Sequence, residues 1–537
     1  MEPFDALLAA TRVLPPDLTA RSARFALVLR PSQDPVAVAD GVRTTLADFA
    51  VRVRPLSPLE PRVLLVDLPG RVPAAAPEVS FEAAYALADA FGLEAAEPDL
   101  PTDFFPEEPL FAPGRESANG FPPWCWVAED PELHDDPRWA LGMMNVPAAW
   151  EFSAARNRLS RGEGVVVAQP DTGVTRHREL DGVFTVPGYD VLDHDDDPTD
   201  PLERGGSPGH GTATASVLVS PGSLVVTGTA PAALHMPIRA ITSVVQISQV
   251  AVAEAIDWAT AHGAQVITMS LGGLFSFSLH RALRRAVRAD VVVLAAAGNC
   301  VGRVVWPARY DECVAVAGVN RHGRKWRGSC SGAAVDVSAP AENVLRARIP
   351  RGDGEPDHGQ GQGTSFAVAM TAGVAALWLA HHGRANLVAE ARRRGETVQA
   401  LFLRLVRATA RRPAEWDSFT MGAGVVDAEA LLRADLDLGR ERETLAGPVS
   451  EADTVRSLVA EAVQPEAADD PLLDWYRFGP EISHAVLAGR TAPAGASEAA
   501  SSWTRPSPRL AKAMANPALQ DVFGLDLAGA PEVGGTS

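Results

Sequence analysis

Three short motifs carry the residue types that nucleophilic catalysis needs. They place Asp171 in DTGV, His210 in GHGT and Ser365 in GTSFA. A serine hydroxyl is too weak an acid to attack an amide unaided, so an imidazole within hydrogen-bond reach must take its proton. A buried carboxylate then fixes the imidazole tautomer. Because Asp, His, Ser is also one of three chain orders known for such triads, the motifs predict an acyl-transfer site.

Short apolar runs alternate with helical stretches from about residue 164 onwards. The runs include VVVAQ, LHMPIRA, QVITM, VVVLAAA and VAVAG. Unbroken apolar strands separated by helices predict an α/β fold, with a mainly parallel sheet covered by helices on both faces. Asp171 follows the first run, His210 opens a helix-prone segment, and Ser365 begins the longest helical pattern, which are usual places for a functional site. Pro170 has no N–H for the ladder, so the first strand is predicted to end there.

These motifs resemble those of the subtilisin-like serine peptidases (subtilases, peptidase family S8), over about residues 139–432. The resemblance implies that Ser365 is the nucleophile, that His210 is first general base and then general acid, and that Asp171 orients and stabilises the imidazolium. AAAGN resembles the oxyanion-hole motif of the family, so Asn299 and the backbone N–H of Ser365 are expected to stabilise the tetrahedral intermediate. We therefore expect a serine endopeptidase that works through an acyl-enzyme.

The segment SLGG resembles the edge strand that pairs with substrate in this family. Backbone pairing of this kind holds an extended peptide, and side-chain pockets set its preference. Ala296 and its neighbours beside the nucleophile are small, so we expect an open pocket. Such a pocket suits a large apolar or unconstrained P1 residue, the substrate residue whose carbonyl is attacked. The substrate-binding residues implied are Ser270, Leu271, Gly272, Gly273, Ala297 and Gly298.

One departure from the family pattern supports an alternative function. The chain reads GTSFAVAMTAG where the family commonly reads GTSMAAPHVAG, so Ala369 stands in place of proline. Alanine is the better helix former, so the helix is expected to form, but the substitution bears on the position of Ser365 at its start. The alternative is a catalytically silent subtilase-fold scaffold that binds peptides.

The N-terminal region has the order strand, helix, strand, strand, helix, strand, which is the ferredoxin-like pattern. Over residues 24–100 it is similar to the inhibitor-type propeptide that precedes many subtilases. The resemblance implies that this region acts as a cis inhibitor of its own peptidase domain. It also implies that the chain cuts itself within the Pro- and acid-rich stretch 98–137.

The chain is therefore expected to comprise four parts. We predict a propeptide-like domain over 20–100, a linker over 101–138, a peptidase domain over 139–436 and a helical C-terminal extension over 437–537. Within the extension, Val455, Leu458, Val459 and Ala462 fall at helical spacing and predict one amphipathic helix.

The composition narrows the classes of partner. The chain has 537 residues, with 48 Lys and Arg against 67 Asp and Glu, and a formal net charge of −19. Bulk charge of this sign does not attract phosphate backbones or anionic lipid, so we expect polypeptide substrates, with neither nucleic acid nor membrane as partner. The N-terminus lacks a basic segment followed by a continuous apolar core. A cytoplasmic location is therefore expected, with leaderless secretion as the alternative.

The expected chemistry requires no cofactor, and no metal ligand is assigned. The acidic loop DHDDDPTD (193–200) offers oxygen ligands of the kind that calcium prefers, but without EF-hand spacing, so calcium stays an alternative. The four cysteines contain no C-x-x-C pair. Buried free thiols are one interpretation, and one disulfide among the last three cysteines is the other. The cysteines are Cys125, Cys300, Cys313 and Cys330.

Overall fold

A seven-stranded sheet forms the centre of the chain. The structure, a computed structural model, describes residues 2–13, 22–74, 76–100, 127–134, 136–202, 207–246, 249–349, 357–439, 450–491 and 505–523. The sheet has the order β15-β14-β13-β11-β7-β9-β8, and its neighbouring strands are parallel. The strands are β7 (Val166–Asp171), β8 (Tyr189–Asp190), β9 (Leu234–Arg239), β11 (Val266–Met269), β13 (Val292–Ala296), β14 (Val314–Val319) and β15 (Val337–Pro340).

Alternating side chains of the strands fill two apolar clusters, one on each face of the sheet. In β13, Val292 and Leu294 belong to the cluster beneath α9, while Val293 and Ala295 belong to the cluster beneath α7 and α8. This follows from the two-residue side-chain period of a strand. The α/β fold predicted from the sequence is confirmed. On the first face lie α4 (Trp139–Met143), α5 (Val146–Ala154), α6 (His210–Val219), α9 (Thr364–His382), α10 (Arg384–Arg394), α11 (Val398–Thr409) and α13 (Ala428–Arg433), and on the second lie α7 (Val250–Ala261) and α8 (Phe277–Arg288).

The apolar character of α9 is explained by its place in the core. This helix is long and apolar enough to cross a membrane by length and composition, yet its apolar window is wholly buried in the protein. Ala369, which is 1% exposed, lies within the unbroken helix, as expected of alanine at that position.

The strand order reverses beside β7. From β7 the chain builds β8 and β9 on one side, and then crosses to build β11, β13, β14 and β15 on the other. Such a switch point opens a crevice at the carboxyl ends of the strands. The prediction that the first strand ends at Pro170 is wrong, because β7 continues to Asp171. Pro170 is tolerated because β11 pairs with β7 only as far as Ala168.

The N-terminal part has the predicted ferredoxin-like order. An antiparallel sheet in the order β3-β4-β2-β6 packs one face on its own helices, and the other face joins the apolar cluster of α7 and α8. The elements are α1 (Pro3–Ala10), β1 (Thr11–Val13), β2 (Ala23–Val28), α2 (Pro35–Thr45), η1 (Ala47–Phe49), β3 (Arg52–Ser57), β4 (Glu60–Leu68), β5 (Arg71–Pro73), α3 (Pro77–Ala90) and β6 (Ala95–Asp99).

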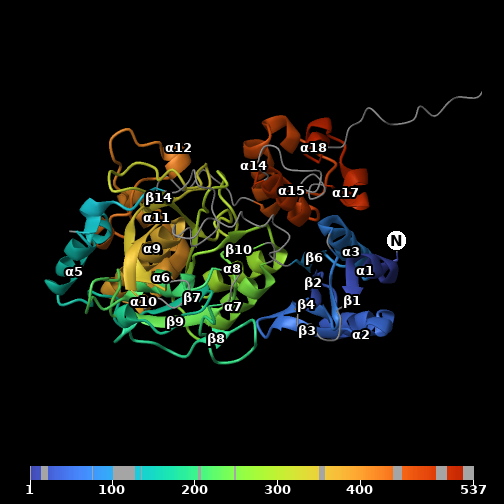
Figure 1. Cartoon of the computed structure of the whole chain (residues 1–537), viewed down its shortest axis with the longest axis horizontal. Coiled ribbons are helices and arrows are strands. Elements are labelled where there is room, and N and C mark those ends of the chain that lie inside the picture. Colours follow the sequence, from blue (N-terminus) through green and yellow to red (C-terminus); the bar gives the residue numbers. More distant parts are fainter. Residues whose placement is uncertain are drawn as a thin grey trace, which may run out of the picture.

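The C-terminal helices lie beside the N-terminal part (Figure 1, red and blue). The predicted amphipathic helix is α14, whose four apolar residues are buried. The C-terminal elements are α14 (Glu451–Ala462), η7 (Pro465–Ala468), α15 (Gly479–Thr491), α17 (Pro508–Ala513) and α18 (Pro517–Val522). The remaining elements are η4 (Pro131–His134), η5 (Arg178–Leu180), β10 (Val245–Gln246), β12 (Gly272–Gly273), β16 (Val344–Arg348), β17 (Asp357–Gly361) and α12 (Ser418–Met421).

The cysteines divide between the two interpretations. Cys313 and Cys330 are buried free thiols, whereas Cys300 is disulfide-bonded. A disulfide between two of the last three cysteines is therefore wrong. Cys125, and most of the linker predicted over 101–138, lie outside the described residues.

Candidate active site

The Asp171 carboxylate and the His210 imidazole are in direct contact. Asp171 ends β7, is 1% exposed, and has its Oδ1 2.7 Å from Nδ1 of His210. The same carboxylate accepts hydrogen bonds from the N–H of Thr172 (2.7 Å) and from Oγ1 of Thr214 (3.1 Å). These donors fix the carboxylate, which in turn holds one orientation of the imidazole and leaves Nε2 on the opposite side of the ring.

The glycines on either side of His210 let the start of α6 pack closely against neighbouring segments. Gly209 has φ +75°, and a Cβ there would lie 2.8 Å from the side chain of Ile349. A Cβ on Gly211 would lie 2.1 Å from the carbonyl oxygen of Gly173. Gly211 is therefore required by the close approach of the helix to the turn that follows Asp171, and Gly209 by its positive φ and by the neighbouring Ile349 side chain.

Asp200 binds residues of both the DTGV and the GHGT motif, a role that the sequence did not reveal. Its Oδ2 accepts hydrogen bonds from Oγ1 of Thr172 and from the N–H of Gly209, both at 2.7 Å. Oγ1 of Thr172 in turn accepts a hydrogen bond from the N–H of Gly211 at 3.1 Å. Burial raises the pKa of Asp200. From the sequence this residue could be assigned only to an acidic loop.

Gln169 and His235 support the site from behind. Burial lowers the pKa of His235 to about 4, so the ring is neutral at pH 7, and its Nε2 donates to Oε1 of Gln169 at 2.8 Å. Nε2 of Gln169 donates to the carbonyl of Gly211 (2.9 Å) and to Oγ1 of Thr214 (2.8 Å). This buried chain of hydrogen bonds links β9, β7 and α6. In the sequence, Gln169 is only the last residue of an apolar run before Pro170, which gives no sign of this role.

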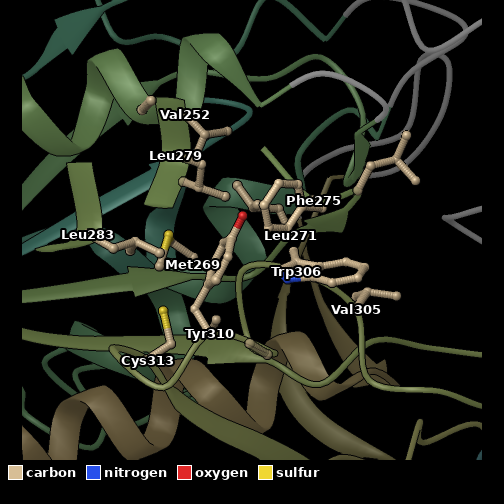
Figure 2. Packing of buried hydrophobic residues seen from close by; sticks show 14 of the residues in the cluster. Val252, Met269, Leu271, Phe275, Leu279, Leu283, Val305, Trp306, Tyr310 and Cys313 are labelled. Atoms are coloured by element: carbon tan, nitrogen blue, oxygen red, sulfur yellow. The ribbon is translucent and has the colours of Figure 1, made fainter. Parts of the chain in front are cut away.

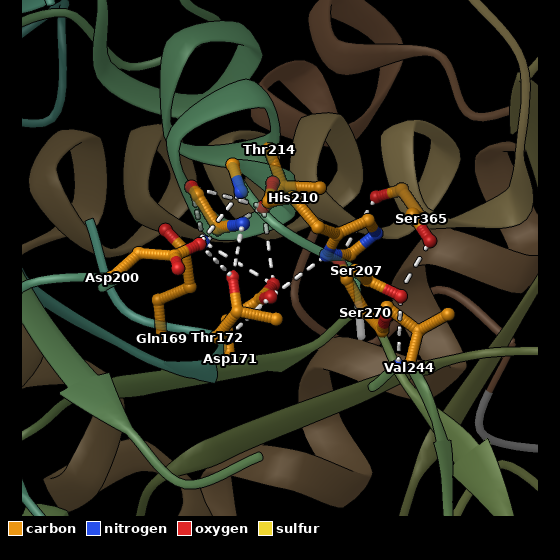
Figure 3. A network of polar contacts seen from close by, with 12 residues as sticks. Gln169, Asp171, Thr172, Asp200, Ser207, His210, Thr214, Val244, Ser270 and Ser365 are labelled. Atoms are coloured by element: carbon orange, nitrogen blue, oxygen red, sulfur yellow. Dashed lines mark hydrogen bonds and ion pairs between the residues drawn. The ribbon is translucent and has the colours of Figure 1, made fainter. Parts of the chain in front are cut away.

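Ser365 is the second residue of α9 and lies beside His210. Its Oγ is 3.4 Å from the carbonyl oxygen of Ser270, and Oγ of Ser270 donates to the Ser365 carbonyl at 3.0 Å. In Figure 3 the His210 ring lies between Asp171 and Ser365. Nε2 of His210 is buried and has no hydrogen-bond partner in the part of the chain that the structure describes. The arrangement thus leaves one imidazole nitrogen available beside a serine hydroxyl.

The side-chain amide of Asn299 lies at the start of α9, next to Ser365. Its Oδ1 accepts hydrogen bonds from the N–H (2.9 Å) and Oγ1 (2.8 Å) of Thr364. Its Nδ2 is thereby left to donate, and lies 3.6 Å from the position of a Cβ built on Gly363. The N–H of Ser365 belongs to the first turn of α9, where backbone donors have no acceptor within the helix. Two N–H donors and the positive end of a helix therefore meet beside the Ser365 hydroxyl.

The predicted substrate strand lies at the edge of this site. Ser270 and Leu271 are buried after the end of β11, and β12 pairs in parallel with β10. The N–H of Gly273 donates to the carbonyl of Trp306 at 2.7 Å. Ala297 is fully buried at the end of β13, and Gly298 donates to Oγ1 of Thr364 at 3.3 Å.

Comparison with known proteins identifies the family. The sequence model of the Subtilase family matches residues 162–424, which contain every residue of the site described above. Thermitase from Thermoactinomyces vulgaris is 35% identical over 246 residues, covering 45% of this chain and 81% of thermitase. The chain belongs to the subtilase family. Subtilisin Savinase from Lederbergia lenta is a further relative of this subtilase, 31% identical over 44% of this chain and 82% of its own. The protein is a serine endopeptidase.

A solved structure shares the fold of this subtilase over more of its length. Fervidolysin from Fervidobacterium pennivorans has a TM-score of 0.55 and 22% sequence identity, and the likeness covers 80% of this chain and 64% of fervidolysin. At that identity the likeness shows the fold alone.

The pocket expected beside the nucleophile is narrower in this subtilase than its small residues suggested. Val305 lies between Gly272 and Gly298: a Cβ on Gly272 would be 2.4 Å from its Cγ2, and one on Gly298 would be 2.9 Å away. The Val305 N–H donates to the carbonyl of Ala297 at 3.1 Å, which fixes the segment in place. Figure 2 shows Val305 next to Trp306 in the apolar cluster. The expectation of an open pocket is therefore wrong, because the Val305 side chain, which belongs to neither motif, occupies the space that the glycines leave.

The acidic loop of this subtilase uses carboxylates for internal contacts. Asp193 in the loop and Asp190 at the end of β8 both bind Arg239, at 2.5 Å, and Asp190 also accepts hydrogen bonds from the N–H of Leu192 and of Asp193. Among the described residues, no group of three His, Cys, Asp or Glu side chains is arranged to hold a metal ion. The loop therefore gives no support to the calcium alternative.

Proposed function

We propose that Ser365, His210 and Asp171 carry out peptide-bond hydrolysis through an acyl-enzyme. Nε2 of His210 takes the proton of the Ser365 hydroxyl as Oγ attacks the carbonyl carbon of the substrate. The same nitrogen then gives the proton to the leaving amine, and a water molecule releases the acyl group by the reverse sequence. Asp171 stabilises the imidazolium that forms in each half-reaction. The observation that carries this proposal is that Nε2 of His210 is buried and has no partner among the described residues, opposite the 2.7 Å contact of its Nδ1 with Asp171.

Negative charge on the attacked carbonyl oxygen is received by two donors. Nδ2 of Asn299 and the N–H of Ser365 are both available, and the start of α9 adds the favourable end of its dipole. The Ser365 hydroxyl, 3.4 Å from the carbonyl of Ser270, is held weakly enough to turn toward His210. Catalytic hydrogen bonds are often formed only when substrate is bound.

The substrate is proposed to be an extended polypeptide with a small P1 residue. Backbone pairing along Gly272–Gly273 would require β12 to separate from β10, because the N–H of Gly272 donates to the carbonyl of Val244 at 2.9 Å. It would place the P1 side chain between this strand and Gly298. Val305 occupies that space, so alanine, glycine and serine fit better than leucine or phenylalanine. This preference is the opposite of the one expected from the sequence.

The N-terminal domain is proposed to block the site until the linker is cut by the chain itself. Glu97 at β6 accepts hydrogen bonds from Oγ of Ser276 (3.0 Å) and from the N–H groups of Phe277 (2.9 Å) and Ser278 (3.1 Å), at the start of α8. Leu100 lines a small cavity together with Leu274, the residue after β12. The chain that leaves the N-terminal domain therefore starts beside the substrate strand.

New N-termini in purified protein test the catalytic proposal. We expect the full chain to acquire an N-terminus within residues 98–137, and the Ser365→Ala variant to remain uncut. Ser457→Ala, an exposed serine in α14, is the matched control and should process like the parent. Cutting that continues in the Ser365→Ala variant would show that Ser365 does not carry out the cleavage. An Asn299→Ala variant that cuts at the parent rate would remove the oxyanion role.

A further inference from the structure

The C-terminal helices contact both the N-terminal domain and the peptidase domain. Figure 1 shows α14, α15, α17 and α18 gathered along α3 of the N-terminal domain, with α14 on the side of the peptidase domain. Buried residues of α14 and α15 share one apolar cluster with residues of α8 and of the N-terminal sheet. The extension thus covers the place where the other two domains meet.

Two arginines of the extension bind acidic residues on α3. Arg509 contacts Glu82 through its guanidinium, and its backbone N–H donates to the same carboxylate at 3.1 Å. Nε of Arg509 lies 3.1 Å from Asp89, and the guanidinium of Arg477 lies 2.7 Å from the other oxygen of Asp89. Glu82 is 5% exposed, so removal of Arg509 would leave a buried carboxylate without this partner.

Aromatic and polar contacts also join the extension to the N-terminal domain. Tyr85 and Phe478 meet edge to face with ring centroids 5.0 Å apart, and the Tyr476 hydroxyl donates to Glu94 at 3.1 Å. Such aromatic pairs add stability beyond the area they bury. This side of the interface is therefore apolar at its centre and charged at its rim.

The same helices are anchored to the peptidase domain. His280 on α8 contacts Glu451 of α14 through Nδ1 and Glu312 of the peptidase domain through Nε2, the latter at 2.9 Å. Arg309, also in the peptidase domain, binds Glu461 at 2.7 Å. The attachment of the extension is therefore independent of the N-terminal domain.

We propose that residues 450–491 and 505–523 form a latch that holds the N-terminal domain on the peptidase domain after the linker has been cut. The N-terminal sheet has its own contacts with α7 and α8, among them Arg54 with Glu254 at 3.0 Å. The extension, which stays covalently attached to the peptidase domain, adds a second set of contacts on α3. Resting on the inhibition proposed above, the latch keeps the peptidase inactive as a cut complex. Activation then requires displacement of the C-terminal helices as well as cleavage.

Release of the N-terminal fragment tests the latch without any need for catalysis. In the full chain carrying Ser365→Ala, a recognition site for a sequence-specific protease is placed in the linker, and the fragment is followed by size-exclusion chromatography after cutting. We expect it to stay bound in the parent, and Arg477→Ala with Arg509→Ala to speed its release about tenfold or more, because a buried carboxylate loses its partner. Asp89→Ala, on the other side of the contact, should act in the same direction.

Arg456→Ala is the matched control, since Arg456 binds Asp453 within the extension itself. This variant should release the fragment at the parent rate. Immediate release from the parent, or equal rates for the parent and the double variant, would overturn the latch. The same double variant is also made in a chain that keeps Ser365. If it releases the fragment faster than the parent but does not gain hydrolysis of a fluorogenic peptide, the latch is supported and the proposed inhibition is overturned.

Discussion

Oδ1 of Asn299 accepts two hydrogen bonds from Thr364, one from the backbone N–H at 2.9 Å and one from Oγ1 at 2.8 Å. These bonds settle which end of the amide faces the Ser365 hydroxyl. Because the oxygen is engaged on the helix side, Nδ2 is the atom that would donate to an oxyanion in the mechanism proposed above. Thr364 is thus a positioning residue that acts through Asn299.

Thr364→Val should lower kcat while leaving KM nearly unchanged. Valine keeps the shape and the backbone N–H, but it loses the hydroxyl that holds Asn299, so the donor is oriented by one bond instead of two. We expect a fall of about tenfold, against about 10²–10³ for Asn299→Ala, which removes the donor itself. Steady-state kinetics on one peptide substrate measure both changes.

Thr364→Ser serves as the conservative control, because it restores the hydroxyl and should recover most of the lost rate. A Thr364→Val variant with a raised KM and unchanged kcat would instead assign the residue to substrate binding.

Val305→Gly should shift the P1 preference toward larger residues. Removing the side chain opens the space between Gly272 and Gly298, into which a leucine or phenylalanine side chain can then enter. We expect kcat/KM for a P1 phenylalanine peptide to rise about 10–100-fold relative to a P1 alanine peptide. Paired measurements on the two peptides give the ratio directly. An unchanged ratio would show that P1 specificity is set elsewhere.

The C-terminal helices should lose stability as the pH rises from about 4 to about 8. Burial, aided by the charge of Glu82, raises the pKa of Glu481 to about 8, and its carboxyl group contacts the hydroxyl of Ser507 at 2.9 Å. A raised carboxyl pKa means that the folded state holds a proton which the unfolded chain gives up near its ordinary pKa of about 4.3. The associated stability is full below that value and is lost as the pH rises through about 8.

Glu481→Gln tests this dependence, since a neutral amide replaces the protonated carboxyl. Thermal unfolding between pH 5 and 9 should show a decline in the parent that is much weaker in the variant. Equal slopes for the two proteins would place the titrating group elsewhere.

Local patterns predicted much of the fold. The apolar runs that became β7, β9, β11, β13 and β14 are buried on both faces, so their composition alone marks them as strands. The ferredoxin-like order and the helix α14 also followed from periodicity. Asp171, His210 and Ser365 lie close together, as the sequence predicts. Asp171 ends a strand, and His210 and Ser365 lie at the starts of helices, so all three are at the same end of the sheet.

Features that depend on side chains meeting from distant segments could not be predicted. Asp200 lies in a loop whose composition suggested a metal, yet it binds Thr172 and Gly209. Val305 fills a pocket whose other walls are glycines in two separate motifs, and neither motif predicts it. The acidic face of α3 likewise gave no sign that it binds arginines more than 380 positions away.

Labelling with a fluorophosphonate shows whether Ser365 is the nucleophile and whether His210 activates it. The full chain, its Ser365→Ala variant and its His210→Ala variant are incubated with the probe before and after the linker is cut and the N-terminal fragment released, and the adduct is located by peptide mapping. We predict a single adduct, on Ser365, that forms once the N-terminal fragment has been released. The adduct should be absent from Ser365→Ala and should form far more slowly in His210→Ala. An adduct on another residue, or none on Ser365 in the folded, released protein, would contradict this prediction.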